Sequence, residues 1–150
     1  MSIWQGFLRK LGLGARPELH PLSVFLLDDD TVRHEWFARR FANDQLDTAV
    51  DPASAIALLS SNFYDAVFLD HDLLPEHYNS DARDDERTGY AVAAWLAAHP
   101  AVQPSAMIIV HTRNADGAMR MVELLRDSGR HAEYVPFPVL SQKVRSYFQR

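Results

Sequence analysis

Acidic and imidazole side chains are concentrated in three stretches of this 150-residue chain, each directly after an apolar run. The stretches are Asp28-Asp29-Asp30, Asp70-His71-Asp72 and His111-Thr112-Arg113-Asn114. Carboxylates that crowd together repel each other, so either their pKa values rise or a cation neutralises them. Mg²⁺ prefers oxygen ligands and keeps several waters, so one or two direct carboxylates suffice. If the stretches converge, they predict a site for Mg²⁺ or Mn²⁺, or for a phosphate. Helix capping by Asp30 and a turn at Asp72 are the alternative for single acids.

Two histidines in these stretches are candidates for proton transfer, because imidazole exchanges protons near pH 7. Beside a metal-bound phosphate, His111 would serve as general acid or base in a reaction of that phosphate. The alternatives are a buried His111 that is hydrogen-bonded to a strand-end carboxylate and a His71 that faces solvent. Guanidinium binds phosphate through paired N–H donors, so Arg83, Arg87 and Arg113 are candidate phosphate clamps. Thr112 and Asn114 complete the candidate phosphate-binding residues.

The elements that must position these residues follow a regular alternation from Ser23 onward. Apolar runs at 23–28, 47–50, 65–70, 106–111 and 132–137 are predicted strands. Helical patterns follow them at 31–42, from Asp51-Pro52, at 88–98, between Asn114 and Gly129, and after residue 137. Such alternation with short loops predicts a doubly wound parallel sheet, (βα)5, in the flavodoxin-like order 2-1-3-4-5. Strands one and three are then neighbours, and ligands bind beyond the carboxyl ends of the strands.

The chain divides into an N-terminal amphipathic extension, residues 1–20, and one domain over 21–150. Apolar side chains of the extension fall on one helical face, which predicts a short helix packed on the domain or on a partner, including a second copy of the chain. A membrane-surface anchor is the alternative. We expect a cytoplasmic protein, since the sequence has neither a run of about 18 apolar residues nor a signal-peptide pattern.

Composition excludes several classes of function. The absence of cysteine excludes a disulfide scaffold, a thiolate zinc site and a cysteine nucleophile. The net charge of −5 provides no global basic field, so direct nucleic-acid binding is not expected.

Several stretches resemble the receiver domain of bacterial response regulators, over roughly residues 22–150. These are VFLLDDD (24–30), DAVFLDHDL (65–73) and MIIVHT (107–112). Within that superfamily the chain is most similar to the cyclic-phosphate-processing receiver-like domain, through LDHDL (69–73), TGYAVAAWL (88–96), IIVHTRNADGAMRMVELLRDSG (108–129) and YVPF (134–137).

The resemblance implies a role for each matching position. Asp29 would bind Mg²⁺ directly, with Asp28 as an outer-shell acid. Asp70 matches the phospho-acceptor and would hold the ion together with Asp29. Asp72 matches a residue whose backbone carbonyl contacts the metal, and here it also brings a carboxylate to the metal. His111 replaces the small hydroxyl residue of the receiver switch.

Three departures from the receiver pattern leave several functions open. Receivers carry a lysine before the proline that follows strand five, whereas this chain has Val135 before Pro136, and its lysines are Lys10 and Lys143. The switch position is a histidine, and the connection after strand three is longer. We expect a metal-binding domain that handles or hydrolyses a phosphate ligand, as a metal-dependent cyclic phosphodiester hydrolase would. The alternatives are a receiver phosphorylated on Asp70 by a phosphodonor protein, and a degenerate receiver that serves as a protein-interaction module.

Overall fold

A computed structural model describes residues 20–73 and 86–147 of the chain. The helix predicted near the N-terminus and most of the long segment after the third strand fall outside these residues. Within the described ranges, no helix combines the length and the apolar character that crossing a bilayer requires.

Five strands form one parallel sheet, as the alternating pattern predicts. They are β1 (Ser23–Leu27), β2 (Gln45–Ala49), β3 (Ala66–Leu69), β4 (Met107–Val110) and β5 (Ala132–Tyr134). The observed order, β2-β1-β3-β4-β5, confirms the predicted topology. The central strand β3 is fully buried along its length, because helices cover both of its faces. The edge strand β2 is mostly exposed, which fits its polar sequence QLDTA.

Five described helices follow the strands: α2 (Thr31–Arg40), α3 (Pro52–Ser61), α4 (Gly89–Ala98), α5 (Ala115–Asp127) and α6 (Phe137–Tyr147). Three of them begin at a side-chain cap, because the carboxylates of Asp30 and Asp51 and the amide of Asn114 accept hydrogen bonds from backbone N–H groups of the first turn. Gly129 follows α5 with a φ of +87°, the left-handed conformation that ends many helices.

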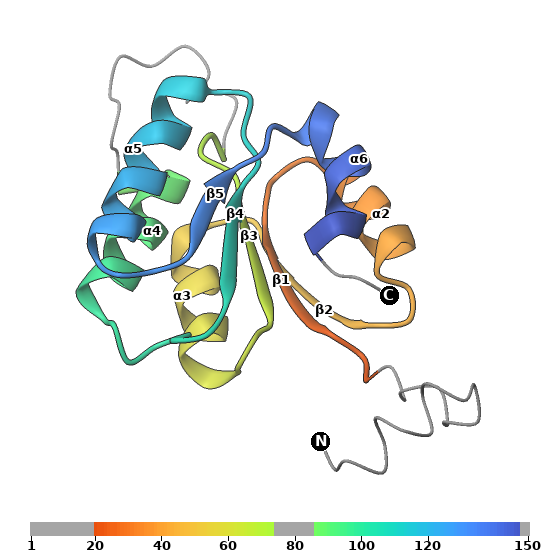
Figure 1. Ribbon diagram of the computed structural model, residues 1–150, viewed down its shortest axis with the longest axis horizontal. Helices are drawn as coiled ribbons and strands as arrows, with labels where there is room; N and C mark the ends of the chain where they lie inside the picture. The colour runs from red at the N-terminus through yellow and green to blue at the C-terminus, as the bar shows by residue number, and fades with distance from the viewer. Residues whose placement is uncertain (1–19, 74–85, 148–150) are drawn as a thin grey trace, which may run out of the picture.

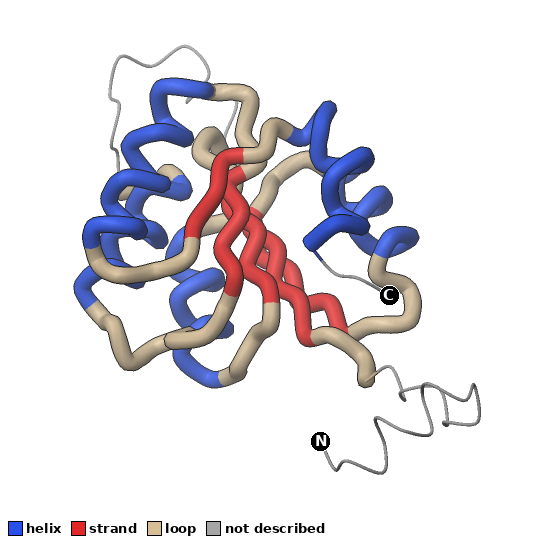
Figure 2. Tube along the Cα trace, viewed as in Figure 1, coloured by secondary structure: helices blue, strands red, loops and turns tan. Residues whose placement is uncertain are grey.

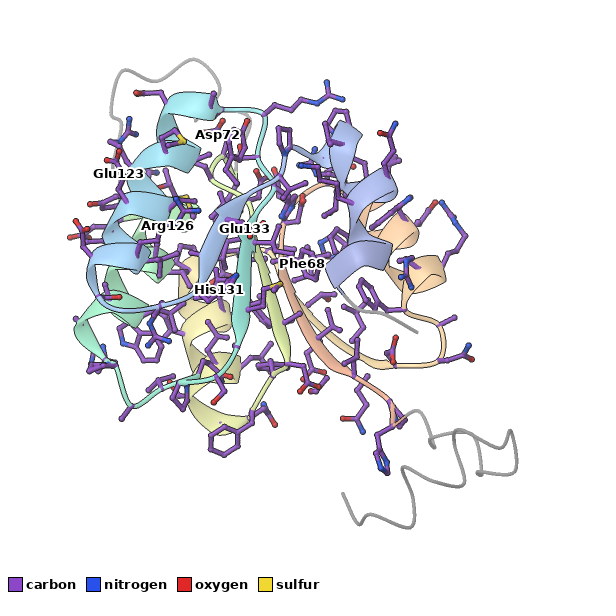
Figure 3. The ribbon with its side chains drawn as sticks, viewed as in Figure 1. Phe68, Asp72, Glu123, Arg126, His131 and Glu133 are labelled. Atoms are coloured by element: carbon purple, nitrogen blue, oxygen red, sulfur yellow. The ribbon has the colours of Figure 1, made fainter. Side chains whose placement is uncertain are left out.

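The helices form two layers around the sheet (Figures 1 and 2). Helices α3, α4 and α5 cover one face, and α2 and α6 cover the other. The first layer buries a large aliphatic core against the sheet. The second layer encloses a smaller core that includes Phe37 of α2, Leu140 of α6 and Phe68 of β3, and the rings of Phe37 and Phe68 pack edge to face. Figure 3 shows Phe68 on the sheet. The site is therefore held by strands that are packed on both sides.

Several strand boundaries differ slightly from prediction, for reasons that matter at the site. Strands β1, β3 and β4 end one residue earlier than predicted, so that Asp28, Asp70 and His111 lie just beyond them. Strand β5 also ends earlier, at Tyr134, because Pro136 has no N–H to donate and α6 begins directly after it.

Candidate functional site

Backbone pairing at the carboxyl edge of the sheet brings Asp28, Asp70 and His111 side by side. The N–H of Asp70 donates to the carbonyl of Leu27 over 2.9 Å, and the N–H of His111 donates to the carbonyl of Leu69 over 3.0 Å. Each residue thus extends the hydrogen-bond ladder by one bond past its strand. The register of three adjacent strands, rather than any local motif, sets the spacing of these side chains.

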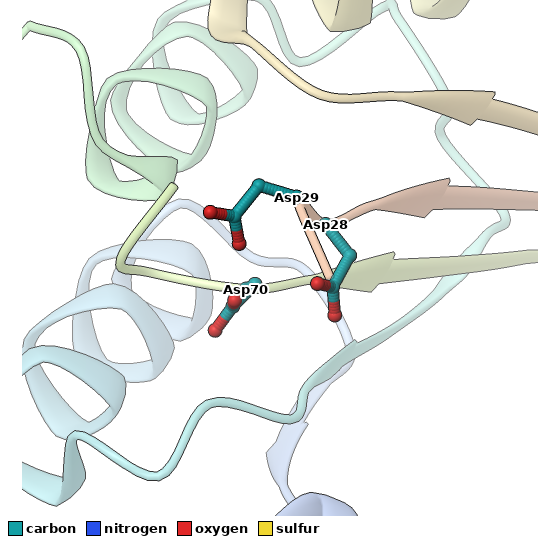
Figure 4. Close-up of side chains that lie close together, drawn as sticks. All are labelled: Asp28, Asp29 and Asp70. Atoms are coloured by element: carbon teal, nitrogen blue, oxygen red, sulfur yellow. The ribbon is translucent and has the colours of Figure 1, made fainter. Parts of the chain in front are cut away.

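Three carboxylates gather at this edge, and we call them the carboxylate cluster: Asp28, Asp29 and Asp70 (Figure 4). One oxygen of each lies within 4.8 Å of the others. Asp28 and Asp70 are buried, whereas Asp29 is half-buried. The inner oxygen Oδ1 of Asp29 is shielded from solvent and has no hydrogen-bond partner. Clustered oxygen donors with one left unsatisfied are the donor set that a hard cation such as Mg²⁺ prefers, so these residues fit the ion.

Arg33, on the first turn of α2, inserts its guanidinium among these carboxylates. Its Nε lies 2.6 Å from Oδ2 of Asp28, and one terminal nitrogen lies 2.8 Å from Oδ1 of the same residue. That terminal nitrogen also donates to Oδ2 of Asp70 over 3.0 Å. Arg33 was not among the residues predicted for the site. It follows Asp30 and Asp29 by three and four residues, and this charge spacing at the start of a predicted helix was the available signal.

Asp28 and Asp70 share this arginine, yet their pKa values shift in opposite directions. Burial of Asp28 favours its neutral form, but hydrogen bonds from His111 and Arg33 outweigh that effect and lower the pKa to about 2. Burial raises the pKa of Asp70 to about 6, and the charge of Asp28 adds to the rise. Burial and the charge of Asp28 also raise the pKa of Asp29. Asp28 is therefore firmly ionised, while the other two carboxylates would gain from a further cation.

His111 lies behind the carboxylate cluster, inside the aromatic core. Its side chain is fully buried, and its Nε2 lies 2.7 Å from Oδ2 of Asp28. Because a carboxylate only accepts, Nε2 carries the proton in this contact. The other ring nitrogen, Nδ1, is buried without a hydrogen-bond partner, and the rings of Phe37 and Phe68 pack nearby. This is the arrangement considered as the alternative in the sequence analysis, a buried histidine on a strand-end carboxylate.

His71 is also buried, and so does not face solvent as a loop histidine would. Its Nδ1 lies 2.7 Å from Oδ1 of Asp72. Its ring lies against Gly117 on α5, where an added Cβ would stand only 2.7 Å from the ring carbon Cδ2. Asp72, a predicted metal ligand, is not a member of the carboxylate cluster. Figure 3 shows Asp72 near the start of α5, and its Oδ1 lies 3.5 Å from the amide nitrogen of Asn114.

The predicted phosphate-binding residues lie on the loop from β4 to α5. Thr112 is buried, and its side chain is hydrogen-bonded to Asp70. Arg113 is exposed. Asn114 caps α5, with its Oδ1 accepting from the N–H of Gly117 over 2.9 Å. Of the other candidate clamps, Arg87 is exposed and residue 83 is outside the described part of the chain.

One histidine that was not predicted for the site lies beside it. His34, on α2, is half-buried, and its Nε2 donates to the carbonyl oxygen of Asp28 over 2.6 Å. The loop after β1 is therefore held by side chains from α2 on both the carboxylate and the backbone of Asp28.

Comparison with known proteins gives one family and many structural relatives. Residues 23–127 match the family described as the cyclic-phosphate processing receiver domain. Among curated proteins, no significant match was found.

Three solved structures illustrate the likeness of fold. A receiver domain protein (CheY-like) from Methanospirillum hungatei JF-1 is 17% identical, with a TM-score of 0.61 over 87% of this chain and 95% of that one. The signal receiver domain of an HD domain-containing protein from Pseudomonas fluorescens Pf-5 is 18% identical, with a TM-score of 0.63 over 87% and 93%. A response regulator from Burkholderia pseudomallei, described with a phosphorylated aspartic acid, a calcium ion and citrate, is 17% identical, with a TM-score of 0.61 over 83% and 65%.

Proposed function

Because the chain belongs to the family of cyclic-phosphate processing receiver domains, we propose that its carboxylate cluster binds Mg²⁺ or Mn²⁺ and that the site handles a phosphate ligand of the cyclic phosphodiester class. One observation carries the proposal: three carboxylates converge within 4.8 Å, and a buried oxygen of Asp29 has no hydrogen-bond partner. An oxygen in that state is stabilised by a cation, and a bound cation in turn attracts a phosphate.

Asp28, Asp29 and Asp70 would hold the ion, which when bound supplies charge neutralisation for phosphoryl oxygens. The chain's own residues do the rest. Thr112, on the loop beside Asp70, is buried, and its hydroxyl would reach a phosphoryl oxygen only by exchanging its present partners, the Asp70 carboxylate and the N–H of Asn114. Arg113, the next residue, is exposed on the same loop and is free to approach an anionic ligand from solvent.

The histidines take different parts in this proposal. His111 contacts Asp28 from the buried side, so we assign it first to holding the charge and orientation of that carboxylate. Its role as general acid or base stays a prediction, as does that of His71. If His111 transfers a proton, His111→Ala lowers the rate by roughly 10²–10⁴-fold. If it only supports Asp28, His111→Asn keeps most activity and the loss appears in stability.

Calorimetry with Mg²⁺ and Mn²⁺ tests the metal site. We expect binding in the wild type and its loss in Asp29→Asn. The matched control is Asp30→Asn, which removes the neighbouring charge but keeps a good helix cap, since asparagine caps as well as aspartate. Equal affinity in the wild type and in Asp29→Asn would exclude the assigned site.

A panel of nucleoside 2′,3′-cyclic phosphates, assayed with either metal, tests the ligand class. Turnover that disappears in Asp29→Asn and persists in Asp30→Asn supports the proposal. Metal binding without turnover or binding of any member would instead favour the protein-interaction module.

A second candidate function is a receiver phosphorylated on Asp70, with a phosphodonor protein as partner. It is favoured by the burial of Asp70 beside Thr112 and by the phosphorylated aspartic acid of the similar Burkholderia pseudomallei protein. The residue after β5 argues against this function, because it is the buried Val135, whereas receivers have a lysine at this position. Lys143 is exposed on α6. Incubation with acetyl phosphate and Mg²⁺ distinguishes the two functions: stoichiometric modification that is abolished in Asp70→Asn would favour the receiver.

A further inference from the structure

The guanidinium of Arg33 occupies the position among the carboxylates where a cation is needed. It contacts both oxygens of Asp28, at 2.6 and 2.8 Å, and one oxygen of Asp70, at 3.0 Å. A further contact of 3.5 Å joins it to the carboxylate of Asp30. Planar, bidentate pairing of this kind is the strongest form of charge-assisted hydrogen bond. Arg33 therefore neutralises part of the carboxylate cluster.

The guanidinium nevertheless satisfies the cluster only in part. Its nearest approach to Oδ1 of Asp29 is 3.8 Å, and that buried oxygen accepts no hydrogen bond. One positive charge also faces the three carboxylates of the cluster. The planar guanidinium is aligned with the carboxylates of Asp28 and Asp70, so it cannot rotate toward Asp29 without losing one of these hydrogen bonds. Arg33 thus neutralises Asp28 and Asp70 in part and leaves Oδ1 of Asp29 without a partner.

We propose that Arg33 is the exchangeable counter-ion of this site: its guanidinium holds the carboxylates together in the metal-free protein, and a divalent cation must displace it to bind. The inference rests on the proposed function, since it concerns the same carboxylates. Two cations on the same oxygens of Asp28 would repel each other at contact distance. The arginine can leave, because it extends from the first turn of a helix and its side chain is 17% exposed.

Exchange predicts that the arginine weakens metal binding. Calorimetric titration of Mg²⁺ and Mn²⁺ at constant ionic strength should give roughly ten- to a hundredfold tighter binding in Arg33→Gln than in the wild type, because displacement of a charge-assisted pair is no longer required. Arg39→Gln is the matched control. It removes the same charge from the same helix, but Arg39 is 69% exposed and contacts only Glu35, at 3.7 Å, among the ion pairs described.

A second variant and an NMR measurement on the wild type test exchange even if Arg33→Gln folds poorly. Arg33→Lys keeps the charge but cannot form the bidentate pair, so its metal affinity should lie between those of the wild type and Arg33→Gln. In the wild type, the Nε–H of Arg33 bonded to Asp28 should give a protected NMR signal that shifts and loses its protection at saturating Mg²⁺.

The outcomes separate this inference from the proposed function. Binding that tightens in Arg33→Gln, and less so in Arg33→Lys, but not in Arg39→Gln supports exchange. Equal affinity in the wild type and Arg33→Gln, an equal gain in Arg39→Gln, weaker binding in Arg33→Gln, or an Nε–H signal unchanged at saturation overturns exchange while leaving the metal site in place. Failure of both the wild type and Arg33→Gln to bind either metal overturns exchange together with the proposed function.

Discussion

Asp28 and Asp70 lie in the same cluster and contact the same arginine, yet replacing each by asparagine should change the stability of the metal-free protein in opposite directions. The pKa of Asp70 is raised to about 6, mainly by burial. That of Asp28 is lowered to about 2, because hydrogen bonds from His111 and Arg33 outweigh its burial. The ionised form of Asp70 thus destabilises the fold, whereas that of Asp28 stabilises it.

The size of the Asp70 effect follows from linkage. The folded state binds this proton more tightly than the unfolded state, so the wild type loses stability as the pH rises from 3.8 through about 6. The full penalty is roughly 3 kcal/mol at pH 8, and it falls to about 1 kcal/mol at pH 4.5. Asp70→Asn removes the penalty and keeps an oxygen for the N–H of His71, which now donates over 2.9 Å. We expect it to stabilise the protein by up to about 3 kcal/mol at pH 8.

The ionised carboxylate of Asp28 has the opposite effect on the free energy of unfolding. Its folded pKa is depressed from 3.8 to about 2, so its stabilisation is present above 3.8 and is lost as the pH falls through about 2. Asp28→Asn therefore loses roughly 2 kcal/mol at neutral pH. The amide also leaves the donors of Arg33 and His111 with one acceptor oxygen in place of two, which adds to the loss.

Urea denaturation in EDTA at pH 8 and pH 4.5 measures both effects. Glu35→Gln serves as the control, since it removes one negative charge from a side chain of α2 that is 69% exposed. The reasoning is refuted if Asp70→Asn destabilises the protein at pH 8, or if its effect is the same at both pH values. If Asp28→Asn, Asp70→Asn and Glu35→Gln all changed the free energy of unfolding by the same small amount, net charge alone would account for the effects.

Two further predictions concern the supports of the site. An alanine Cβ at Gly89 would stand 1.7 Å from the backbone oxygen of Asp70. Gly89→Ala should therefore destabilise the protein by about 3 kcal/mol or more and lower its affinity for metal. An unchanged urea midpoint would contradict this packing. Arg130 donates to the carbonyls of Leu96, His99, Val102 and Gln103 around the end of α4. Arg130→Gln should lose about 2–4 kcal/mol in the same denaturation assay with no change in metal affinity, and a loss of metal binding in a folded protein would show that this support extends to the site.

Much of the architecture follows from local pattern. SVFLLD and DAVFLD are short apolar runs that end in acid, and runs of this length are typical of strands buried on both faces. Asp51-Pro52 and Asn114 mark helix starts through capping chemistry that involves neighbouring residues only. The convergence of Asp28 and Asp70 was predictable as well, because strand ends in a parallel sheet of this order meet at one edge.

Tertiary structure decided what each side chain does at that edge. Arg33 was overlooked because nothing in the local sequence shows that its guanidinium turns inward onto Asp70, 37 residues away. His111 contacts Asp28 across 83 residues of sequence, and Asp72 pairs with His71 outside the carboxylate cluster. Strand position depends on local periodicity, so the residues that reach the carboxyl edge were predictable. Their partners were not, since hydrogen bonds and pKa values depend on distances and burial that arise when separate strands and helices pack together.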